Sequence, residues 1–288
     1  MAPTTLPGGT WTLGDLTVTR FGYGAMQLAG PWVMGPPADH DGALAVLREA
    51  VALGITHIDT SAAYGPHVTN RLIREALHPY PESLHVVTKV GADRDQQGGW
   101  PTARDPESLR RQIRENLETL GVETLDLVNL RLGDAEGPKP GSLAEALETL
   151  VALQQEGVIR HLGLSNVTPE QVAEAQTVAP IVCVQNQYNL AHRGDDDLID
   201  DLARQGVAYV PFFPLGGFTP LQSSALSAVA ERLGATPMGV ALAWLLRRSP
   251  NILLIPGTKS VAHLRENVAG AGLSLSGDDL AELDRIGR

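Results

Sequence analysis

The chain has 288 residues, of which 43% are hydrophobic, and this is enough to bury one sizeable core. Its formal net charge of −11 argues against wrapping nucleic acid or docking on an anionic membrane, although a local positive cluster can still bind an anionic cofactor. The single cysteine, Cys183, cannot form an internal disulfide, and we find neither a signal-peptide pattern nor an apolar run of about 18 residues, so we expect a cytoplasmic protein.

Short apolar runs alternate with longer segments of helical spacing along most of the chain. Before them, Thr10–Val18 is predicted to form a hairpin that closes the bottom of a barrel, and Val18–Gly22 to form the first barrel strand. The further strands expected are His57–Asp59, Leu84–Lys89, Leu125–Arg131, Ile159–Ser165, Ile181–Asn186, Val207–Phe212 and Ile252–Pro256. Ser276–Ile286 is expected to form a C-terminal helix.

Several helix starts are marked by a capping side chain, followed in three cases by a proline whose missing N–H costs nothing there. These starts are Asp105-Pro106, Thr168-Pro169 and Thr236-Pro237, and the capping-box pattern fits Ser142 with Glu145 and Thr168 with Gln171. Eight strand-then-helix units in series favour an α/β fold of the (β/α)8 TIM barrel type, with an open doubly wound sheet as the alternative. We find no linker or repeat, so residues 1–288 are predicted to form a single domain.

In a (β/α)8 barrel the functional site lies where the strands end. The polar residues expected at these ends are Asp59, Lys89, Arg131, Ser165, Asn166, Gln185, Lys259 and Ser260. A lysine that ends a buried strand is more often a solvated terminus than a catalytic group. The recurrence of polar residues at so many strand ends favours a functional site.

The same segments resemble the aldo-keto reductase family. The matching stretches are Asp59-Thr-Ser-Ala-Ala-Tyr64-Gly65 with Asn70 following, Val87–Lys89, Gly163–Val167, Gln185–Asn189 and Ile255–Ser260. They occur in the family's order and span most of the chain. The resemblance implies the same barrel and the reduction of an aldehyde or ketone, with a hydride from NADPH and a proton from a tyrosine.

By this resemblance, Tyr64 is the proton donor, Lys89 lowers its pKa, and Asp59 is the partner of the lysine. Free tyrosine has a pKa of ~10, too high for efficient acid–base work near neutrality, and a neighbouring ammonium stabilises the phenolate. The alternative for Tyr64 is a loop aromatic that roofs the barrel.

The family's fourth catalytic position usually holds a histidine, and Arg131 stands there in this chain. One interpretation is that Arg131 orients the carbonyl or anchors an acidic oxygen of the substrate, because a guanidinium stays charged and offers a fork of donors. The other is that Arg131 forms a salt bridge and the barrel is a weak reductase. A branch that resembles pyridoxal reductases has a similar Val-Asn-Leu-Arg strand, which makes pyridoxal or another aromatic aldehyde a candidate substrate.

The cofactor residues also follow from the resemblance, since the chain has no Gly-x-Gly-x-x-Gly segment opening a helix. Ser165, Asn166 and Gln185 match the residues that hold the nicotinamide amide. Phe212 stands where an aromatic usually stacks on the nicotinamide ring, although it can equally be a core residue. Pro214, Leu215 and Gly216, with Gly217, would lie along the pyrophosphate, where a lack of side chains permits close backbone approach.

The adenine end of the cofactor falls on Gly257, Lys259, Ser260, His263, Glu266 and Asn267. A lysine, a hydroxyl and a helix N-terminus together suit an anion, which favours the 2′-phosphate of NADPH over NADH. His263 stands where the family often has an arginine, and a neutral histidine weakens that preference. The alternative for His263 and Glu266 is a surface helix with ordinary charges.

Three functional alternatives follow. The first is an NADPH-dependent reductase whose partner is a small carbonyl compound, acting as a monomer or weak homo-oligomer. The second is a catalytically weak NADPH-binding regulatory protein, and the third is a barrel enzyme of another chemistry, such as a lyase. No metal is predicted, because the histidines show no ligand spacing. Trp32 and Trp100, in loops that would shape the pocket, are either pocket walls or ordinary packing residues.

Overall fold

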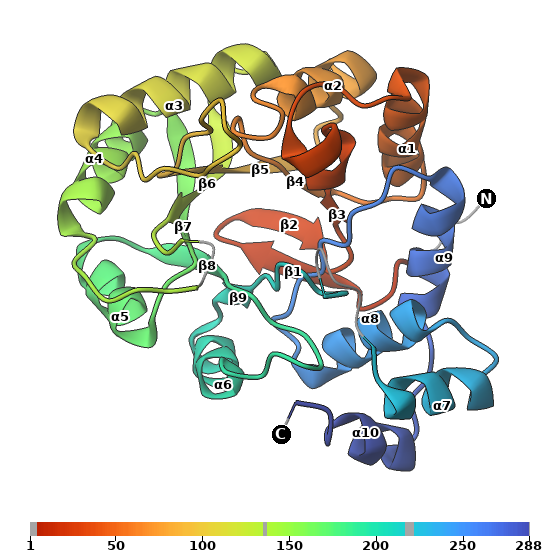
Figure 1. Ribbon diagram of the computed structural model, residues 1–288. Coiled ribbons are helices and arrows are strands. Elements are labelled where there is room, and N and C mark those ends of the chain that lie inside the picture. The colour runs from red at the N-terminus through yellow and green to blue at the C-terminus, as the bar shows by residue number, and fades with distance from the viewer. Residues whose placement is uncertain (1–4, 135–136, 217–221, 288) are drawn as a thin grey trace.

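The computed structural model describes residues 5–134, 137–216 and 222–287 (Figure 1). Parallel strands form a curved sheet in the order β3-β4-β5-β6-β7-β8-β9, with helices arranged around it (Figure 1). The strands are β3 (Tyr23–Gly24), β4 (His57–Asp59), β5 (His85–Val90), β6 (Leu125–Arg131), β7 (Ile159–Ser165), β8 (Ile181–Gln185) and β9 (Ala208–Tyr209). Their residues are almost all buried, as expected for parallel strands covered on both faces.

The predicted eighth strand, Ile252–Pro256, closes the sheet into a barrel. Its residues form isolated parallel bridges to both neighbours, Ile252 with Tyr209 and Leu254 with Phe21. Leu253 N donates to Tyr209 O at 2.9 Å and Leu254 N donates to Arg20 O at 2.7 Å. The predicted (β/α)8 barrel is therefore confirmed, with an eighth segment that is bonded on both sides although it is not a continuous strand.

The predicted first strand, Val18–Gly22, was placed too early. Val18 belongs to the hairpin of β1 (Thr10–Leu13) and β2 (Leu16–Thr19), where it pairs with Trp11. The first barrel strand follows at β3, preceded by the bridge from Phe21. The physical reason is that the antiparallel pairing with β1 satisfies the backbone groups of β2.

The hairpin lies at the end of the barrel where the strands begin, as predicted. Its apolar residues Leu13, Leu16 and Val18 belong to the same buried cluster as Leu127 and Leu253 of the barrel. In the turn, Asp15 pairs with Arg160 and His161 near the start of β7. The hairpin thus closes one end of the barrel and leaves the opposite end for a site.

The helices form the outer ring (Figure 1). They are α1 (His40–Ala52), α2 (Val68–Leu77), α3 (Pro106–Leu120), α4 (Ala144–Gln155), α5 (Pro169–Val178), α6 (Asp196–Gln205), α7 (Ser224–Arg232), α8 (Pro237–Arg248), α9 (Val261–Ala271) and α10 (Gly277–Leu283), with 3-10 turns at Ala25–Leu28 and Pro31–Val33. The predicted C-terminal helix is confirmed as α10. None of the helices in the described part of the chain has the length and apolar character that crossing a membrane requires.

The predicted helix caps are mostly present. Asp105, Thr168 and Thr236 each accept a hydrogen bond from the backbone N–H three residues on, ahead of α3, α5 and α8, and Thr168 with Gln171 forms a complete capping box. The capping box predicted at Ser142 was wrong. Helix α4 starts after Leu143, and the Ser142 hydroxyl donates instead to Glu174 at 2.5 Å.

Candidate active site

A buried polar cluster lies at the carboxyl ends of β4, β5 and β8. Lys89 Nζ donates to Oδ1 of Asp59 at 2.5 Å and to the carbonyl of Thr60 at 3.1 Å. Gln185 Nε2 donates to the other carboxylate oxygen, Oδ2, at 2.9 Å. Asp59, Lys89 and Gln185 are all at least nine-tenths buried, so the carboxylate is held at both oxygens away from solvent.

Tyr64 lies on the loop after β4, where Gly65 turns the chain with a φ of 91°. Lys89 Nζ is 5.4 Å from the centre of the Tyr64 ring. Burial disfavours the charge of Lys89, but the Asp59 carboxylate and the Tyr64 hydroxyl outweigh burial and raise the pKa of Lys89 above its ordinary value. Lys89 is therefore a charged ammonium beside the tyrosine at neutral pH.

Arg131 ends β6 and lies near the same tyrosine. Its guanidinium is centred 5.7 Å from the ring of Phe212, and its Nη2 donates to the carbonyl of Asp134 at 3.4 Å. Burial lowers the pKa of Arg131, while its attraction to Tyr64 and Asp134 opposes that shift. Within the described residues, Arg131 donates to a carbonyl, lies against an aromatic ring and forms no direct ion pair with a carboxylate.

Ser165 ends β7, Asn166 follows it, and both lie next to Gln185. Asn166 has a left-handed backbone with a φ of 59°, and its N–H donates to the carbonyl of Gln185 at 2.9 Å. Its side-chain Nδ2 donates to the carbonyl of Asp134 at 2.8 Å. The structure therefore brings Ser165, Asn166 and Gln185 together next to the Asp59–Lys89 pair.

Three side-chain oxygens of these residues are buried with no hydrogen-bond partner among the described residues: Ser165 Oγ, Asn166 Oδ1 and Gln185 Oε1. Buried polar atoms are normally paired, so such a group is a place for a ligand to bind. The set contains two acceptors and one hydroxyl. A carboxamide, with two N–H donors and one acceptor oxygen, is the complement of that set, and these residues therefore fit the nicotinamide amide.

Phe212 lies beyond β9 and is bridged to Gln187, while its ring meets that of Phe213 edge-on at 5.3 Å. Pro214 is buried, and Leu215 and Gly216 are half-buried. Gly216 has a φ of 93°. Gly217, predicted to continue this segment, lies outside the described residues.

The residues predicted for the adenine end gather where α9 begins. Gly257 packs closely on Gly24, because a Cβ at Gly257 would lie 2.7 Å from the Gly24 carbonyl oxygen. Ser260 is the N-cap of α9 and accepts from the N–H of His263 at 3.3 Å. Lys259, His263 and Glu266 are exposed, and Asn267 is buried.

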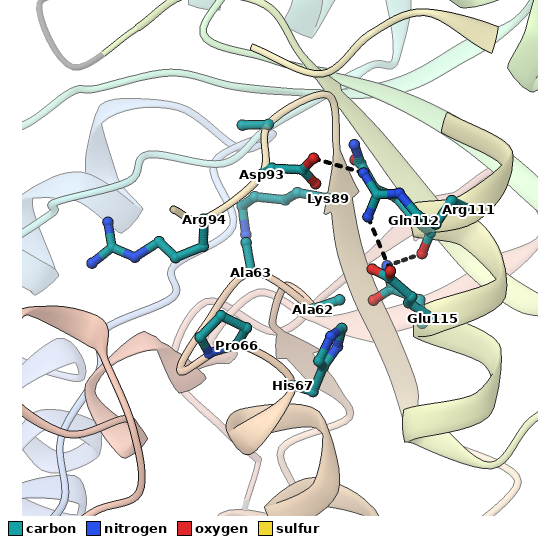
Figure 2. Close-up of a pocket in the computed structure, with 12 residues that line it drawn as sticks. Ala62, Ala63, Pro66, His67, Lys89, Asp93, Arg94, Arg111, Gln112 and Glu115 are labelled. Carbon is teal, nitrogen blue, oxygen red and sulfur yellow. Dashed lines mark hydrogen bonds and ion pairs between the residues drawn. The ribbon is translucent and has the colours of Figure 1, made fainter. Parts of the chain in front are cut away.

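A cavity of about 210 Å³ opens beside Lys89, between the Tyr64 loop, the loop after β5 and helix α3 (Figure 2). Arg111 crosses its wall and pairs with Asp93 at 2.6 Å and with Glu115 at 2.9 Å. Of its charged side chains the sequence pointed to Lys89 alone, because the others come from a loop and a helix with no shared motif. Within the described residues we find no cluster of three metal-ligating side chains.

Two further residues contact the Tyr64 region. The ring of Trp100 meets that of Tyr64 edge-on at 6.2 Å, and the guanidinium of Arg94 lies 4.0 Å from the centre of the Trp100 ring. The sequence left Trp100 as either a pocket wall or an ordinary packing residue, and it gave no sign of Arg94. A single arginine in a polar loop follows no pattern that would have marked it.

Comparisons with known proteins agree with this geometry. A family model described as the aldo/keto reductase family matches residues 20–288. Pyridoxine 4-dehydrogenase of Escherichia coli (strain K12) is 61% identical over 285 residues, covering 98% of this chain and 100% of that protein. An uncharacterized oxidoreductase of Schizosaccharomyces pombe is 38% identical over 281 residues, covering 97% of this chain and 90% of that protein.

Solved structures match over nearly the whole chain. A thermostable aldo-keto reductase in complex with the inhibitor epalrestat is 30% identical with a TM-score of 0.82, covering 96% of this chain and 99% of that chain. An aldo-keto reductase from Klebsiella pneumoniae in complex with NADPH is 26% identical with a TM-score of 0.79, covering 99% of this chain and 95% of that chain.

Proposed function

This chain belongs to the aldo/keto reductase family, and from that premise we propose that it is an NADPH-dependent oxidoreductase that reduces an aldehyde or ketone to an alcohol, with Tyr64 as the proton donor. The observation that carries the proposal is the buried ion pair of Lys89 and Asp59 beside Tyr64. A charged lysine held next to a tyrosine is the arrangement that stabilises a phenolate after proton donation.

In this proposal, residues of the chain supply the proton and stabilise the charge that its loss leaves behind. Tyr64 donates its hydroxyl proton to the carbonyl oxygen of the substrate, and the ammonium of Lys89 stabilises the phenolate that remains. Asp59 keeps Lys89 charged and in place, because burial alone would disfavour that charge. NADPH, when bound, supplies the hydride for the carbonyl carbon.

We further propose where the cofactor is held. Ser165, Asn166 and Gln185 would bind the nicotinamide amide, and their three unpaired buried oxygens support this assignment. The proposed contacts of the rest of the cofactor are Phe212 with the nicotinamide ring, Pro214, Leu215 and Gly216 with the pyrophosphate, and Gly257, Lys259, Ser260, His263, Glu266 and Asn267 with the adenine end. Support for NADPH over NADH comes from Lys259 and Ser260 at the start of α9.

For the substrate we propose an aromatic aldehyde with an acidic oxygen near the carbonyl, of which pyridoxal is the example. Two observations favour this class. Arg131 presents a guanidinium near Tyr64 without a carboxylate partner among the described residues. The Escherichia coli relative that is 61% identical is named for dehydrogenation of pyridoxine at position 4, and reduction of pyridoxal is the reverse of that chemistry.

The test is NADPH oxidation with 4-nitrobenzaldehyde and with pyridoxal, comparing wild type with Tyr64→Phe. Tyr80→Phe is the matched control, since the Tyr80 hydroxyl donates to the Leu120 carbonyl away from this cluster. We expect turnover with both aldehydes in wild type and in the control, and its loss in Tyr64→Phe. Tight NADPH binding without Tyr64-dependent turnover would favour the regulatory alternative, and absence of NADPH binding would contradict both.

A further inference from the structure

Two loops flank Tyr64 from different sides. On one side, Tyr64 packs in a small apolar cluster with Ala29 and Val33, against which Met26 also lies. On the other side, the ring of Trp100 meets the Tyr64 ring edge-on. The position of the tyrosine ring therefore depends on two segments that are far apart in the sequence, residues 26–33 and the loop after β5.

The first of these loops has an unusual backbone. Trp32 and Val33 have φ values of 58° and 61°, in the left-handed region that residues with side chains rarely adopt. The loop is bonded to the Tyr64 loop, because Gly65 N donates to Val33 O at 3.2 Å and Gly35 N donates to Gly65 O at 3.1 Å. Backbone of this kind persists only where its surroundings hold it.

Arg94 joins the two loops. One of its terminal nitrogens, Nη2, donates to the carbonyl of Trp32, and the other, Nη1, donates to the carbonyl of Gly98. Its guanidinium lies over the ring of Trp100 at 4.0 Å. In Figure 2 the side chain points away from Arg111 and Asp93, so it does not take part in their ion pairs.

The chemistry of these contacts suits arginine and no other side chain. A planar guanidinium can stack on an indole and at the same time donate to two carbonyl oxygens from separate nitrogens. A lysine ammonium has no flat face to stack and only one nitrogen from which to donate. The acidic neighbour Asp95 attracts Arg94 electrostatically but forms no direct ion pair with it among the described residues, and its carboxylate accepts from Gly99 N at 2.6 Å. Among the described residues, Arg94 is thus paired with carbonyls and a ring in place of a carboxylate.

We propose that Arg94 is a positioning residue for the reaction: it holds the Trp32 carbonyl and the Trp100 ring together across the mouth of the barrel, and so fixes Tyr64 between the two loops. Its kinetic consequence rests on the proposed function, in which Tyr64 is the proton donor. Its structural consequence does not, because the contacts involve neither cofactor nor substrate.

The test compares Arg94→Ala with Arg110→Ala, a matched control on α3 whose arginine forms an exposed pair with Glu156. We expect Arg94→Ala to lower kcat for 4-nitrobenzaldehyde by about tenfold or more, with the Kd for NADPH unchanged, because a displaced proton donor slows the reaction without removing a cofactor contact. Guanidinium ion at low millimolar concentration should restore kcat in Arg94→Ala and change nothing in the control.

A second measurement uses the cofactor-free protein. Acrylamide quenching of tryptophan fluorescence should increase in Arg94→Ala and return toward the wild-type value with guanidinium ion. The proposal is overturned if Arg94→Ala has the wild-type kcat. It is also overturned if kcat falls, guanidinium ion does not restore it, and acrylamide quenching stays at the wild-type level. If Arg94→Ala does not fold, Arg94→Lys replaces it, with partial loss of kcat expected and wild-type kcat again overturning the proposal.

The two proposals fail in different ways. If wild type shows no Tyr64-dependent turnover, the proposed function is contradicted, and the quenching experiment still decides whether Arg94 holds the loops. If wild type turns over and Arg94→Ala does so equally well, the proposed function stands and the role of Arg94 is wrong.

Discussion

Gln185 donates a hydrogen bond of 2.9 Å to Oδ2 of Asp59, the carboxylate oxygen that Lys89 does not bind. The other end of the same side chain, Oε1, is buried without a partner among the described residues. Gln185 therefore connects two parts of the proposed site. Its N–H holds the carboxylate that pairs with Lys89, and its carbonyl oxygen would bind the cofactor amide in the site proposed above.

Replacing Gln185 with leucine should affect both parts. Loss of a buried hydrogen bond to a charged group lowers the free energy of unfolding by about 1.5–3 kcal/mol, and loss of Oε1 weakens NADPH binding. Urea unfolding and fluorescence titration with NADPH measure the two effects. Gln154→Leu is the control, because the Gln154 amide also donates one hydrogen bond, at 2.8 Å, but at the surface. Unchanged stability in Gln185→Leu would contradict the role assigned to it.

The barrel could be predicted from the sequence because its strands are local patterns. β4, β6 and β7 were predicted to the residue, and each is a mostly buried segment that ends in a polar residue. The first strand could not be placed in the same way. The predicted hairpin, Thr10–Val18, and the predicted first strand, Val18–Gly22, share Val18, and only its pairing with β1 decides that Val18 belongs to the hairpin.

The same distinction between local patterns and long-range contacts applies to the candidate site. Motifs predicted that Asp59, Lys89 and Gln185 belong to one site, and the structure places them in contact. The contact between Gln185 and Asp59 joins residues 126 positions apart, so no local pattern reveals it. Arg94 was missed for the same reason, because its partners Trp32 and Trp100 are recognisable only once the loops are folded.

Arg131→Ala should impair turnover of pyridoxal more than that of 4-nitrobenzaldehyde. Removing a charge-assisted hydrogen bond costs about 1.5–3 kcal/mol, which corresponds to a roughly 10- to 150-fold fall in kcat/KM for a substrate with an acidic oxygen. The plain aldehyde lacks that oxygen and serves as the internal control. Arg131→Lys should give an intermediate loss, because a lysine keeps the charge without the fork of donors. Equal losses on both substrates would exclude an anchoring role.

His57, the first residue of β4, should make stability depend on pH. It is 1% exposed and its Nδ1 has no partner among the described residues. Burial lowers its pKa from 6.5 to about 4. The negative charge of Asp59 opposes this shift and the positive charge of Lys89 adds to it, and both effects are smaller than that of burial. Because the pKa of His57 is lower in the folded state than in the unfolded state, the stability that neutral His57 contributes is fully present above about pH 6.5. It is lost as the pH falls toward 4.

The size of this effect follows from the shift in pKa. Between pH 7 and pH 5, His57 should account for about 2 kcal/mol of lost unfolding free energy. Urea unfolding of wild type and His57→Met at both pH values measures it. Wild type and His57→Met share the carboxylates that also titrate in this range. The difference between the pH dependences of the two proteins therefore isolates the contribution of His57. Parallel pH dependences would show that His57 does not titrate as assigned.

Arg20 should be one of the main determinants of stability, because it joins the first and last parts of the barrel. It is 8% exposed, and its guanidinium donates to the carbonyls of Ile252 at 3.0 Å, Leu246 at 3.0 Å and Ser249 at 2.6 Å. Its own carbonyl accepts from Leu254 N. Burial lowers its pKa, but a guanidinium stays charged at neutral pH.

Arg20→Met would leave these buried carbonyls without donors, at a cost of about 3–5 kcal/mol in unfolding free energy. Urea unfolding followed by tryptophan fluorescence measures the loss. Arg160→Met is the control, because Arg160 pairs with Asp15 at the surface of the hairpin end and should matter much less. Arg20→Lys should fall between wild type and Arg20→Met, since an ammonium cannot reach all three carbonyls in one geometry. If Arg20→Met were as stable as wild type, the closure of the barrel would not depend on this side chain.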